Sequence, residues 1–519
     1  MPTPFSGKIF TFTNPDGSEF QVRGWGNQYA ARFETLDGFT VVKDPKSGYF
    51  QYARLSADKN RLEPSGINVG DEDPQSLGMP MHAKVRRAAA KEQARMAQAE
   101  LGGKRRWEIR REQKKAQNLD IARSSGPGAA PPPGTTTGTY VGICVLIDFP
   151  DVPATIGQAE VDNYCNQVGY AGFGNNGSVR DYFEDVSDGN LTYTNVVTTY
   201  YTASNNRAYY TDPAIPFGTR ARELITEALN DLVSQGYDFS PLSSDSGGFI
   251  YALNVYYAGN VVNNWSEGLW PHSWSLAAPF DIGGGRRFFD YQFTDMSNEL
   301  VLRTFCHENG HMICDFPDLY DYGGESTGPG HFCLMGYGGA DKNPTQVCAY
   351  LKHAAGWTSS ITTITSGMTG SVTAGQNEFY IHAKNPSEYF ILENRQQTGR
   401  DATLPDAGLA IWHVDETGSN NNEQMTPAMH YECSLEQADG QFDLEGNANY
   451  GDAEDLFASP LATAFSDTTS PNARWWNGSN SGLSISQISA SAATMTFSTG
   501  TVVSQSEDIT PVLELLLLD

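Results

Sequence analysis

The sequence predicts an α+β protein whose strands and helices are grouped in blocks along the chain, and three observations support this prediction. Residues 1–75 alternate apolar and polar side chains in short runs broken by turn signals, as antiparallel hairpins do. Residues 140–314 combine nearly continuous apolar strands with helical stripes. Beyond Trp357 the patterns are mainly those of short strands, so this last part should be rich in β-structure.

The first expected unit, residues 1–82, is a small β unit of hairpins, with a turn at residues 14–17 (Asn-Pro-Asp-Gly). The second unit, residues 83–134, is a basic helical arm followed by a Pro/Gly linker. The arm is rich in Ala, Glu, Gln, Lys and Arg, which predicts a solvated helix interrupted at Gly102 and Gly103. The linker is exposed by composition and offers a place for a protease to cut.

Charge is unevenly distributed between this arm and the rest of the protein. The chain has 61 Asp+Glu against 34 Lys+Arg, a formal net charge of −27. Residues 84–123 reverse that balance, with 13 Lys+Arg and 5 Asp+Glu. The overall acidity argues against nucleic acid as a partner, because phosphate binding requires a basic surface. The chain thus joins a basic arm to an acidic body, and the fold should show where the arm lies on that body.

The third expected unit, residues 135–357, should be built around a buried strand at residues 140–149. Its other expected elements are a short helix at residues 179–183, a strand pair at 191–201, a helix at 220–233, a strand at 249–258 and a helix at 298–314 capped by Ser297. The fourth unit, residues 358–500, is a β-rich part with strands around residues 378–382, 388–392, 408–414 and 493–498. Residues 501–519 form an acidic and apolar tail.

Targeting signals and cysteines limit the choice of compartment. The sequence has no run of 18 apolar residues, so we expect no transmembrane segment. The first residues lack the apolar region of a signal peptide. All seven cysteines follow residue 140, and the odd number leaves at least one thiol unpaired. No Cys-x-x-Cys pair is present, which argues against a structural zinc or redox site built from cysteines.

A candidate metal site lies in the helix expected at residues 298–314. His307 and His311 are four residues apart, so they project from one helical face and can offer two imidazoles to one ion. Glu308 lies beside them and can reach a water on that ion. The alternative is a helix that carries two histidines and a surface glutamate without any metal.

Three neighbouring features favour the metal. The helix is apolar on its other side and therefore buried, and buried polar side chains need a polar partner such as an ion. Pro317 should end the helix and bring a carboxylate back towards the ion. Met335 follows in a tight turn flanked by glycine.

These motifs resemble the immune inhibitor A family of metallopeptidases (thuringilysins), of the metzincin type. The resemblance is carried by His-Glu-x-x-His at residues 307–311, Pro-Asp-Leu-Tyr-Asp at residues 317–321 and the turn at Met335. It extends to residues 14–17, 32–38, 270–272, 408–415, 437–440 and 451–452. The resemblance implies a metzincin-like zinc peptidase domain, with a twisted sheet, an active-site helix and a Met-turn. It also implies a β-rich C-terminal part and a prosegment of β-hairpins and helix.

The third zinc ligand departs from the general metzincin pattern. That pattern has a glycine three residues after the second histidine and the third ligand six residues after it, where this chain has Cys314 and Pro317. A one-residue insertion in the turn would still deliver Asp318, which we favour because Pro317 fixes an extended approach. Asp315, four residues after His311, is the competitor.

The resemblance implies a zinc-dependent endopeptidase that hydrolyses peptide bonds in proteins. Three protein ligands leave one position for water, whose pKa falls to about 7 on zinc. Glu308 would take the proton of this water and pass it to the leaving amine. Tyr337 would hydrogen-bond to the oxyanion, unless it is simply a packed aromatic residue. Met335 would form the apolar floor beneath the metal.

The basic arm and the linker suggest a latent precursor, and the family resemblance implies that it is secreted. Residues 1 to about 135 would act as an intramolecular inhibitor that covers the cleft until the linker is cut. Because this segment has no cysteine, a thiolate cannot block the metal, and His82 or an acidic side chain remains a candidate. The alternative is a domain that assists folding without inhibiting the enzyme.

A second metal is expected in a Gly-rich loop near the C-terminal end. Its oxygen ligands would come from Asp439, Asp443, Asp452 and Asp455, a composition that suits Ca²⁺. The alternative is a solvated acidic loop. Two rival interpretations apply to the chain as a whole: a catalytically silent scaffold that keeps the fold, and a zinc hydrolase of another class.

Overall fold

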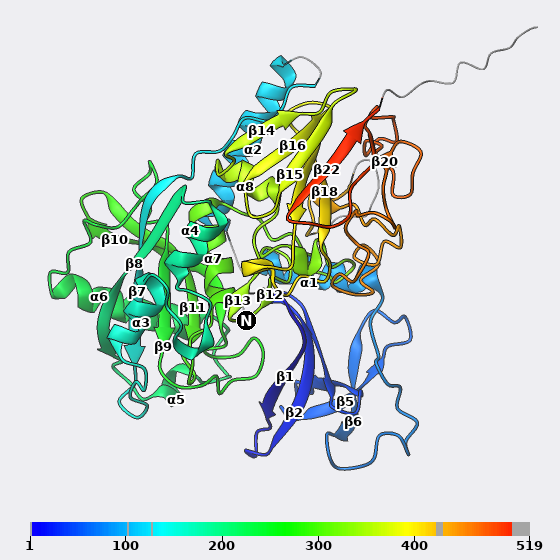
Figure 1. Ribbon diagram of the computed structural model, residues 1–519. Coiled ribbons are helices and arrows are strands. Elements are labelled where there is room, and N and C mark those ends of the chain that lie inside the picture. The colour runs from blue at the N-terminus through cyan, green and yellow to red at the C-terminus, as the bar shows by residue number, and fades with distance from the viewer. Residues whose placement is uncertain (1–2, 101–102, 126–127, 422–428, 501–519) are drawn as a thin grey trace, which may run out of the picture.

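The computed structural model describes residues 3–100, 103–125, 128–421 and 429–500 and has a mixed α+β architecture (Figure 1). The tail at residues 501–519 and part of the expected linker, residues 126–127, lie outside the described residues. Within the described ranges, no helix has both the length and the apolar character needed to cross a bilayer. All seven cysteines are buried free thiols.

The N-terminal segment folds as six antiparallel strands in sequence order, which confirms the predicted hairpins. The strands are β1 (Phe5–Thr13), β2 (Glu19–Gly26), β3 (Ala31–Thr35), β4 (Thr40–Lys43), β5 (Phe50–Leu55) and β6 (Leu62–Asn68). One face of the sheet buries an aromatic core that includes Phe12, Phe33 and Phe50. The ring centroids of Phe12 and Phe33 are 4.7 Å apart, within the range of favourable aromatic packing.

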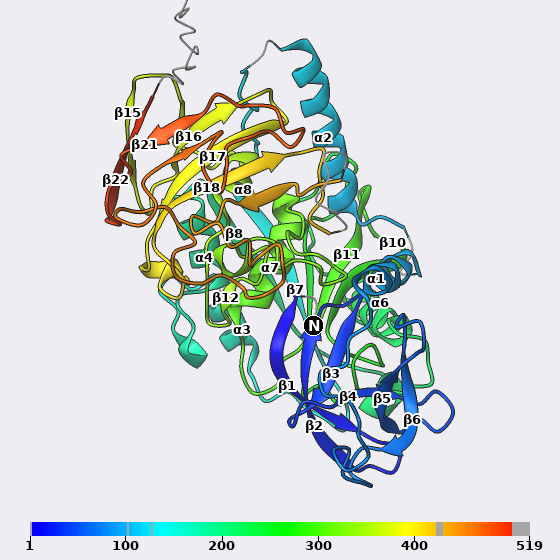
Figure 2. The ribbon, with the colours of Figure 1, turned by 90° about the vertical axis from the view of Figure 1, so that its right-hand side faces the viewer.

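The basic arm forms two helices, α1 (Arg87–Glu100) and α2 (Arg106–Ser124). Figure 2 shows α2 running along the side of the C-terminal sheets, and its first turns pack against α7 (Leu302–Cys314). The prediction of a solvated helix is therefore wrong for one face of α2, where Trp107 is buried. Helix α1 ends before and α2 begins after the predicted interruption at Gly102 and Gly103, of which Gly102 lies outside the described residues.

The linker is less exposed than its composition predicts. Pro131 in the linker and Thr136 just after it are buried. The carbonyl of Pro131 accepts a hydrogen bond from His353 Nε2 (3.1 Å), and the carbonyl of Thr136 accepts one from Trp357 Nε1 (2.8 Å). Both partners lie in or just after α8 (Ala349–Ala355), so this stretch is anchored to the body of the protein.

The central sheet has five strands in the order β10-β11-β9-β7-β8. Its strands are β7 (Gly138–Asp148), β8 (Leu191–Thr202), β9 (Leu253–Tyr257), β10 (His272–Gly283) and β11 (Arg286–Asp295). All neighbours run parallel except β10 and β11. The predicted buried strand is β7, which lies inside the sheet. The strand pair predicted at residues 191–201 is wrong, because this segment is one long strand, β8.

Helices cover both faces of the central sheet. Alternate residues of β7 face opposite sides: Cys144 and Leu146 enter one apolar core, and Val145 and Ile147 enter another. The first core contains residues of α3 (Gln158–Asn166), α4 (Val179–Val186) and α7, and the second contains residues of α6 (Thr219–Ser234). The short helix α5 (Arg207–Tyr210) lies near α6. The layers bring α7 close to the centre of the molecule.

The start of α7 differs from the prediction. Ser297 does not cap the helix but lies in a turn with φ 46°, where its backbone N–H donates to the carbonyl of Gly259 (3.1 Å). The helix begins at Leu302, after Val301 in an extended conformation. The side chain of Ser297 bonds to Asp295, which keeps its hydroxyl away from the helix N-terminus.

The C-terminal part consists of two sheets with a shared core. One sheet has the order β14-β16-β17-β18-β19 and the other β15-β22-β21-β20. Their strands are β14 (Ser360–Thr363), β15 (Thr369–Thr373), β16 (Glu378–Ala383), β17 (Glu388–Arg395), β18 (Gly408–Asp415), β19 (Cys433–Leu435), β20 (Phe465–Ser466), β21 (Ser484–Ser486) and β22 (Thr494–Thr499). The predicted β-rich character is confirmed.

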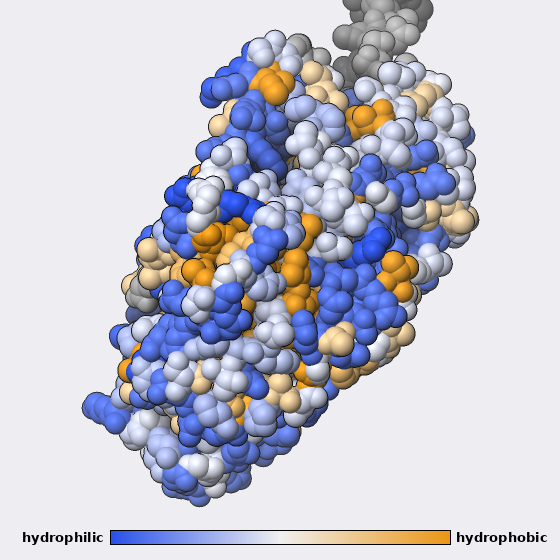
Figure 3. All heavy atoms as spheres, turned by 90° about the vertical axis from the view of Figure 1, so that its left-hand side faces the viewer, coloured by the Kyte–Doolittle hydropathy of each residue, from blue (hydrophilic) through white to orange (hydrophobic). Residues whose placement is uncertain are grey.

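The C-terminal sheets also pack on the region around α7. Trp357, Ile381 and Trp412 belong to the same apolar core as Phe305 and Ile313 of α7. The expected boundary between residues 357 and 358 therefore lies within one continuous core. Figure 3 shows a side of the molecule whose surface is mostly hydrophilic, with apolar residues gathered in small groups, as expected for an acidic protein.

Candidate metal centre

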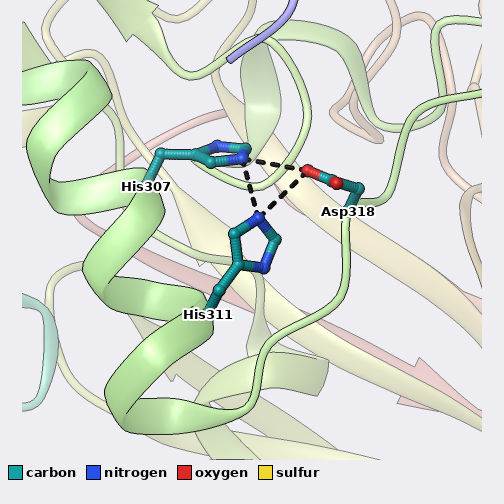
Figure 4. A group of neighbouring side chains, drawn as sticks. All are labelled: His307, His311 and Asp318. Carbon is teal, nitrogen blue, oxygen red and sulfur yellow. Dashed lines mark hydrogen bonds and ion pairs between the residues drawn. The ribbon is translucent and has the colours of Figure 1, made fainter. Parts of the chain in front are cut away.

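Three side chains converge at the C-terminal half of α7. His307 and His311 project from one face of this helix, and Asp318 reaches them from the turn that follows (Figure 4). Asp318 Oδ1 lies 2.9 Å from His307 Nε2 and 3.3 Å from His311 Nε2, and the two Nε2 atoms are 3.2 Å apart. All three side chains are buried. The structure thus brings together the two predicted histidines and Asp318.

The hydrogen bonds on the far side of each imidazole fix its tautomer. His307 Nδ1 lies 3.0 Å from the carbonyl of Leu334, and His311 Nδ1 lies 2.6 Å from the carbonyl of Phe316. A carbonyl can only accept, so each Nδ1 carries the hydrogen and donates it. Each neutral ring then presents the lone pair of Nε2 to the centre. In this state two nitrogen lone pairs and a carboxylate oxygen face one point, an arrangement that suits a metal cation.

The end of α7 separates Asp318 from its competitor Asp315. Asp315 adopts a left-handed conformation (φ 58°) and ends the helix two residues before Pro317, so the prediction that proline ends it is wrong. The Asp315 carboxylate points to α2, where Arg110 Nε donates to it (2.8 Å). The chain then turns back and delivers Asp318 to the histidines.

Tyr322 supports Asp318 from behind. Its hydroxyl donates a 2.8 Å hydrogen bond to Oδ2 of Asp318, which leaves Oδ1 directed at the two imidazoles. Burial would raise the pKa of Asp318, but the histidines hold this pKa below its ordinary value. Burial would lower the pKa of His311, but the Asp318 carboxylate raises it. The carboxylate is thus kept ionised in a buried site.

The turn around Met335 shapes the floor of the centre. The carbonyl of Leu334 in this turn accepts the hydrogen bond from His307, and the backbone N–H of Leu319 donates to the carbonyl of Met335 (2.8 Å). A Cβ on Gly310 would lie only 3.1 Å from Met335 Sδ. The glycine in His-Glu-Asn-Gly-His therefore lets the methionine pack directly beneath the helix.

Glu308 and Tyr337 occupy different surroundings. Glu308 is buried beside His311, and its charge contributes to raising the pKa of that histidine. The Tyr337 ring packs on Tyr450, with centroids 4.4 Å apart. Tyr320 lies near both the centre and Tyr337, with its ring centroid 6.5 Å from that of His307 and 6.1 Å from that of Tyr337. Tyr337 is thus held in an aromatic cluster next to the site.

A buried amide anchors α7 to the central sheet. Asn309 Nδ2 donates to Asn254 Oδ1 of β9 (2.9 Å), and the hydroxyl of Tyr193 on β8 donates to Asn309 Oδ1 (2.6 Å). These bonds fix the height and rotation of the helix that carries both histidines. Sequence reasoning missed this role, although an Asn on the buried side of an otherwise apolar helix is a signal that could have revealed it.

The other histidines lie away from the centre. His272 bonds to the carbonyl of Trp270 and the hydroxyl of Tyr291, and His430 pairs with Asp415. His82, a candidate for blocking the metal, instead pairs with Glu34 in the N-terminal sheet, 2.8 Å away. The structure therefore does not place His82 at the centre.

The arm covers the centre with an aromatic residue that sequence reasoning missed. The Trp107 ring stacks on the imidazole of His311, with centroids 4.6 Å apart and planes inclined by 19°. Asp290 of β11 accepts hydrogen bonds from the backbone N–H groups of Arg106 (2.9 Å) and Trp107 (3.1 Å), and so caps α2. The sequence does hold a signal of this role, because Trp107 is a single tryptophan in a polar, basic helix.

The donor set fits zinc. A tetrahedral Zn²⁺ with ligands at about 2.0–2.1 Å separates its ligand atoms by roughly 3.3 Å. The three distances between Oδ1 of Asp318 and the two Nε2 atoms are 2.9, 3.3 and 3.2 Å, close to that edge length. Two imidazoles and one carboxylate leave a fourth position free, as catalytic zinc sites do.

A second acidic cluster forms in the loop between β19 and β20. Asp439, Asp452 and Asp455 each offer a carboxylate oxygen within 4.8 Å of the others. Asp443 is not part of this group and instead accepts a hydrogen bond from Asn449 (3.1 Å). Burial and the neighbouring carboxylates raise the pKa of Asp455 to about 7. The structure thus gathers three of the four predicted calcium ligands.

The chain is distantly similar to metalloprotease precursors. Two relatives, the pre-pro-metalloprotease PrtV of Vibrio cholerae serotype O1 strains M66-2 and ATCC 39315 / El Tor Inaba N16961, are each 25% identical to the chain over 248 residues. The match covers 38% of this chain and 27% of each relative, so it spans about a quarter of their length. No protein-family model matches the chain.

Proposed function

We propose that this chain is the precursor of a zinc-dependent endopeptidase of the metzincin type, similar to the immune inhibitor A family. The observation that carries the proposal is the convergence of two tautomer-fixed imidazoles and the Asp318 carboxylate on one point. Similarity to PrtV, whose name describes a metalloprotease precursor, supports the same class. Protein or peptide chains would be the substrates.

The residues around the centre divide the chemistry among them. His307, His311 and Asp318 would hold zinc, which supplies a Lewis acid that polarises the scissile carbonyl and acidifies water when it is bound. The Glu308 carboxylate would accept a proton from the attacking water and deliver it to the leaving amine. Tyr337 would donate to the oxyanion once its aromatic cluster with Tyr450 rearranges.

Residues 1 to about 135 would keep the precursor latent. Trp107 covers His311, and α2 is tied to the body of the protein by ion pairs, so a substrate could not reach the metal centre while α2 is in place. The block would come from coverage by this tryptophan and not from a zinc-binding side chain of the arm. We further propose that the enzyme acts outside the cell, as the family resemblance implies.

The cluster of Asp439, Asp452 and Asp455 would bind Ca²⁺. Three carboxylates at such short range repel one another, and a hard cation with oxygen ligands relieves this repulsion. Asn449 links the cluster to Asp443, because it donates to Asp452 (2.5 Å) as well as to Asp443. In this proposal Asp443 supports the site from outside.

One experiment tests the proposed activity. The full chain is loaded with zinc, cut in the linker by a trace of added protease, and freed of its N-terminal segment. We expect one zinc per chain and cleavage of casein that depends on Glu308. A protein that holds no stoichiometric zinc would contradict the proposal. Zinc without proteolysis would favour a silent scaffold or, if sugar or amide substrates are cleaved, another class of zinc hydrolase.

A further inference from the structure

Among the buried carboxylates on the surface that α2 covers, three form ion pairs with this helix. Asp245 lies before β9, Asp315 ends α7, and Glu432 precedes β19, so they come from three distant parts of the chain. Their side chains are only 5%, 4% and 6% exposed. Burial of three acids on one surface is costly unless each is paired with a cation.

All the cations that pair with these acids within the described chain belong to α2. Asp245 pairs with Arg106 (3.0 Å) and Asp315 with Lys114 (2.8 Å). Arg110 bridges these two acids, 3.6 Å from Asp245 and 2.8 Å from Asp315. The two carboxylates therefore border the same space.

Glu432 forms a second ion-pair site farther along α2. Lys115 Nζ lies 3.1 Å from its Oε2, and Arg111 pairs with its Oε1. The hydroxyl of Tyr350 donates to the same carboxylate (2.5 Å), which fixes its orientation. A cavity of about 490 Å³ beside α2 is lined by Trp107, Pro317 and Glu432, among others. The helix therefore leaves part of the space above the covered surface open.

This acidic surface is continuous with the metal centre. Asp315 lies between His311 and Asp318 in sequence, and Trp107, one turn before Arg110 and Arg111, stacks on His311. A chain that crosses the metal centre and continues along this surface would meet the same acids that α2 meets. Once α2 leaves, the three carboxylates lose every ion pair named above and would be satisfied again by a cationic chain.

We propose that the surface under α2 is a row of substrate subsites selective for Lys and Arg side chains, one formed by Asp245 with Asp315 and the other by Glu432. The basic arm occupies these subsites in the precursor. This inference rests on the proposed peptidase function and adds its substrate class: polypeptides with basic residues on one side of the cleaved bond. Buried charge complementarity is the source of the selectivity.

The test uses the cut protein freed of its N-terminal segment and a series of matched peptides. Each peptide carries Lys, Gln or Glu at successive positions on either side of a common cleavage site. We expect kcat/KM to fall about tenfold or more from Lys to Gln on one side only, and further with Glu. A synthetic peptide of residues 103–125 should inhibit competitively, and its version with Gln in place of Lys and Arg should not.

Variants assign the selectivity to the acids. Asp245→Asn and Glu432→Gln should each shrink the preference for Lys at a different position, while Asp162→Asn, a matched change on the exposed surface of α3, should leave it intact. Equal rates for Lys, Gln and Glu at every position would overturn the inference, as would a preference that both variants retain. Absence of casein cleavage would instead contradict the proposed function itself.

Discussion

The indole of Trp107 lies flat against the imidazole of His311, the second histidine of the metal centre. The contact joins a residue of the basic arm to a side chain whose other ring nitrogen is held by the carbonyl of Phe316. Any movement of α2 therefore changes the exposure of the metal centre directly.

Replacing Trp107 with alanine should weaken latency. A buried tryptophan is worth about 3–5 kcal/mol relative to alanine, so the uncut variant should cleave casein at least about tenfold faster than the uncut parent. Arg123→Gln is a matched control, because Arg123 pairs only within α2, with Asp120. If the uncut Trp107 variant is as inactive as the parent, or if cutting the parent does not raise its activity, the segment assists folding and does not inhibit.

Replacing Glu308 with glutamine should separate chemistry from metal binding. The variant should keep one zinc per chain, since Glu308 is not among the converging ligands, but lose about 100-fold or more in kcat because no carboxylate can move the proton. Metal analysis and peptide hydrolysis on the same cut sample measure both effects. An active Glu308→Gln enzyme would remove Glu308 from the mechanism.

The two candidate third ligands should behave differently. Asp318→Ala should abolish stoichiometric zinc, because it removes the oxygen that faces both imidazoles. Asp315→Asn should keep zinc, since asparagine tolerates the left-handed conformation, and should loosen α2 by removing the charge that Arg110 and Lys114 bind. The reverse result in metal analysis would make Asp315 the ligand.

Loss of the Tyr322 hydroxyl should weaken zinc binding without abolishing it. Hydrogen bonds to metal ligands contribute about 10–100-fold in affinity, so Tyr322→Phe should raise the zinc dissociation constant by that factor. Competition with a chelator measures it. Tyr320→Phe serves as a control, because its ring packs near His307 while Tyr322 supplies the bond to Asp318. Equal affinities for Tyr322→Phe and the parent would exclude this support.

Calcium should stabilise the protein most at high pH. Burial and neighbouring carboxylates raise the pKa of Asp455 to about 7 in the folded chain, so its contribution to stability is present at low pH and is lost as pH rises through that value. Calcium should offset the loss, and the rise in Tm on adding Ca²⁺ should be larger at about pH 8 than at about pH 5. Asp455→Asn should flatten both effects. A Ca²⁺ response that does not change with pH would contradict this cluster as the site.

Local patterns in the sequence predicted several elements and the spacing of the metal ligands. The hairpins before residue 75 and the spacing of His307 and His311 follow from periodicity, and the interior strand β7 follows from a nearly continuous apolar run. The sequence did not reveal the roles of residues that act through contacts between distant segments. Trp107 meets His311 across about two hundred positions, and Asn309 meets Tyr193 across more than a hundred, so no local pattern reports either contact.

Errors arose where local signals compete. Ser297 has the chemistry of a helix cap, but its hydroxyl is taken by Asp295, and the helix starts later. The composition of the linker predicts exposure, yet the carbonyl of Pro131 bonds to His353 of α8, and that of Thr136, just after the linker, bonds to Trp357. In both cases a specific hydrogen bond outweighs the average behaviour of the residue type.

The anchored stretch at Pro131 and Thr136 separates two events in the life of the precursor. A cut between α2 and Pro131 breaks the chain but leaves every ion pair of α2 in place, because none of them depends on chain continuity. The severed arm then stays bound until it dissociates. The lifetime of that covered intermediate, set by dissociation and shortened by salt, would therefore control when the enzyme first meets a substrate.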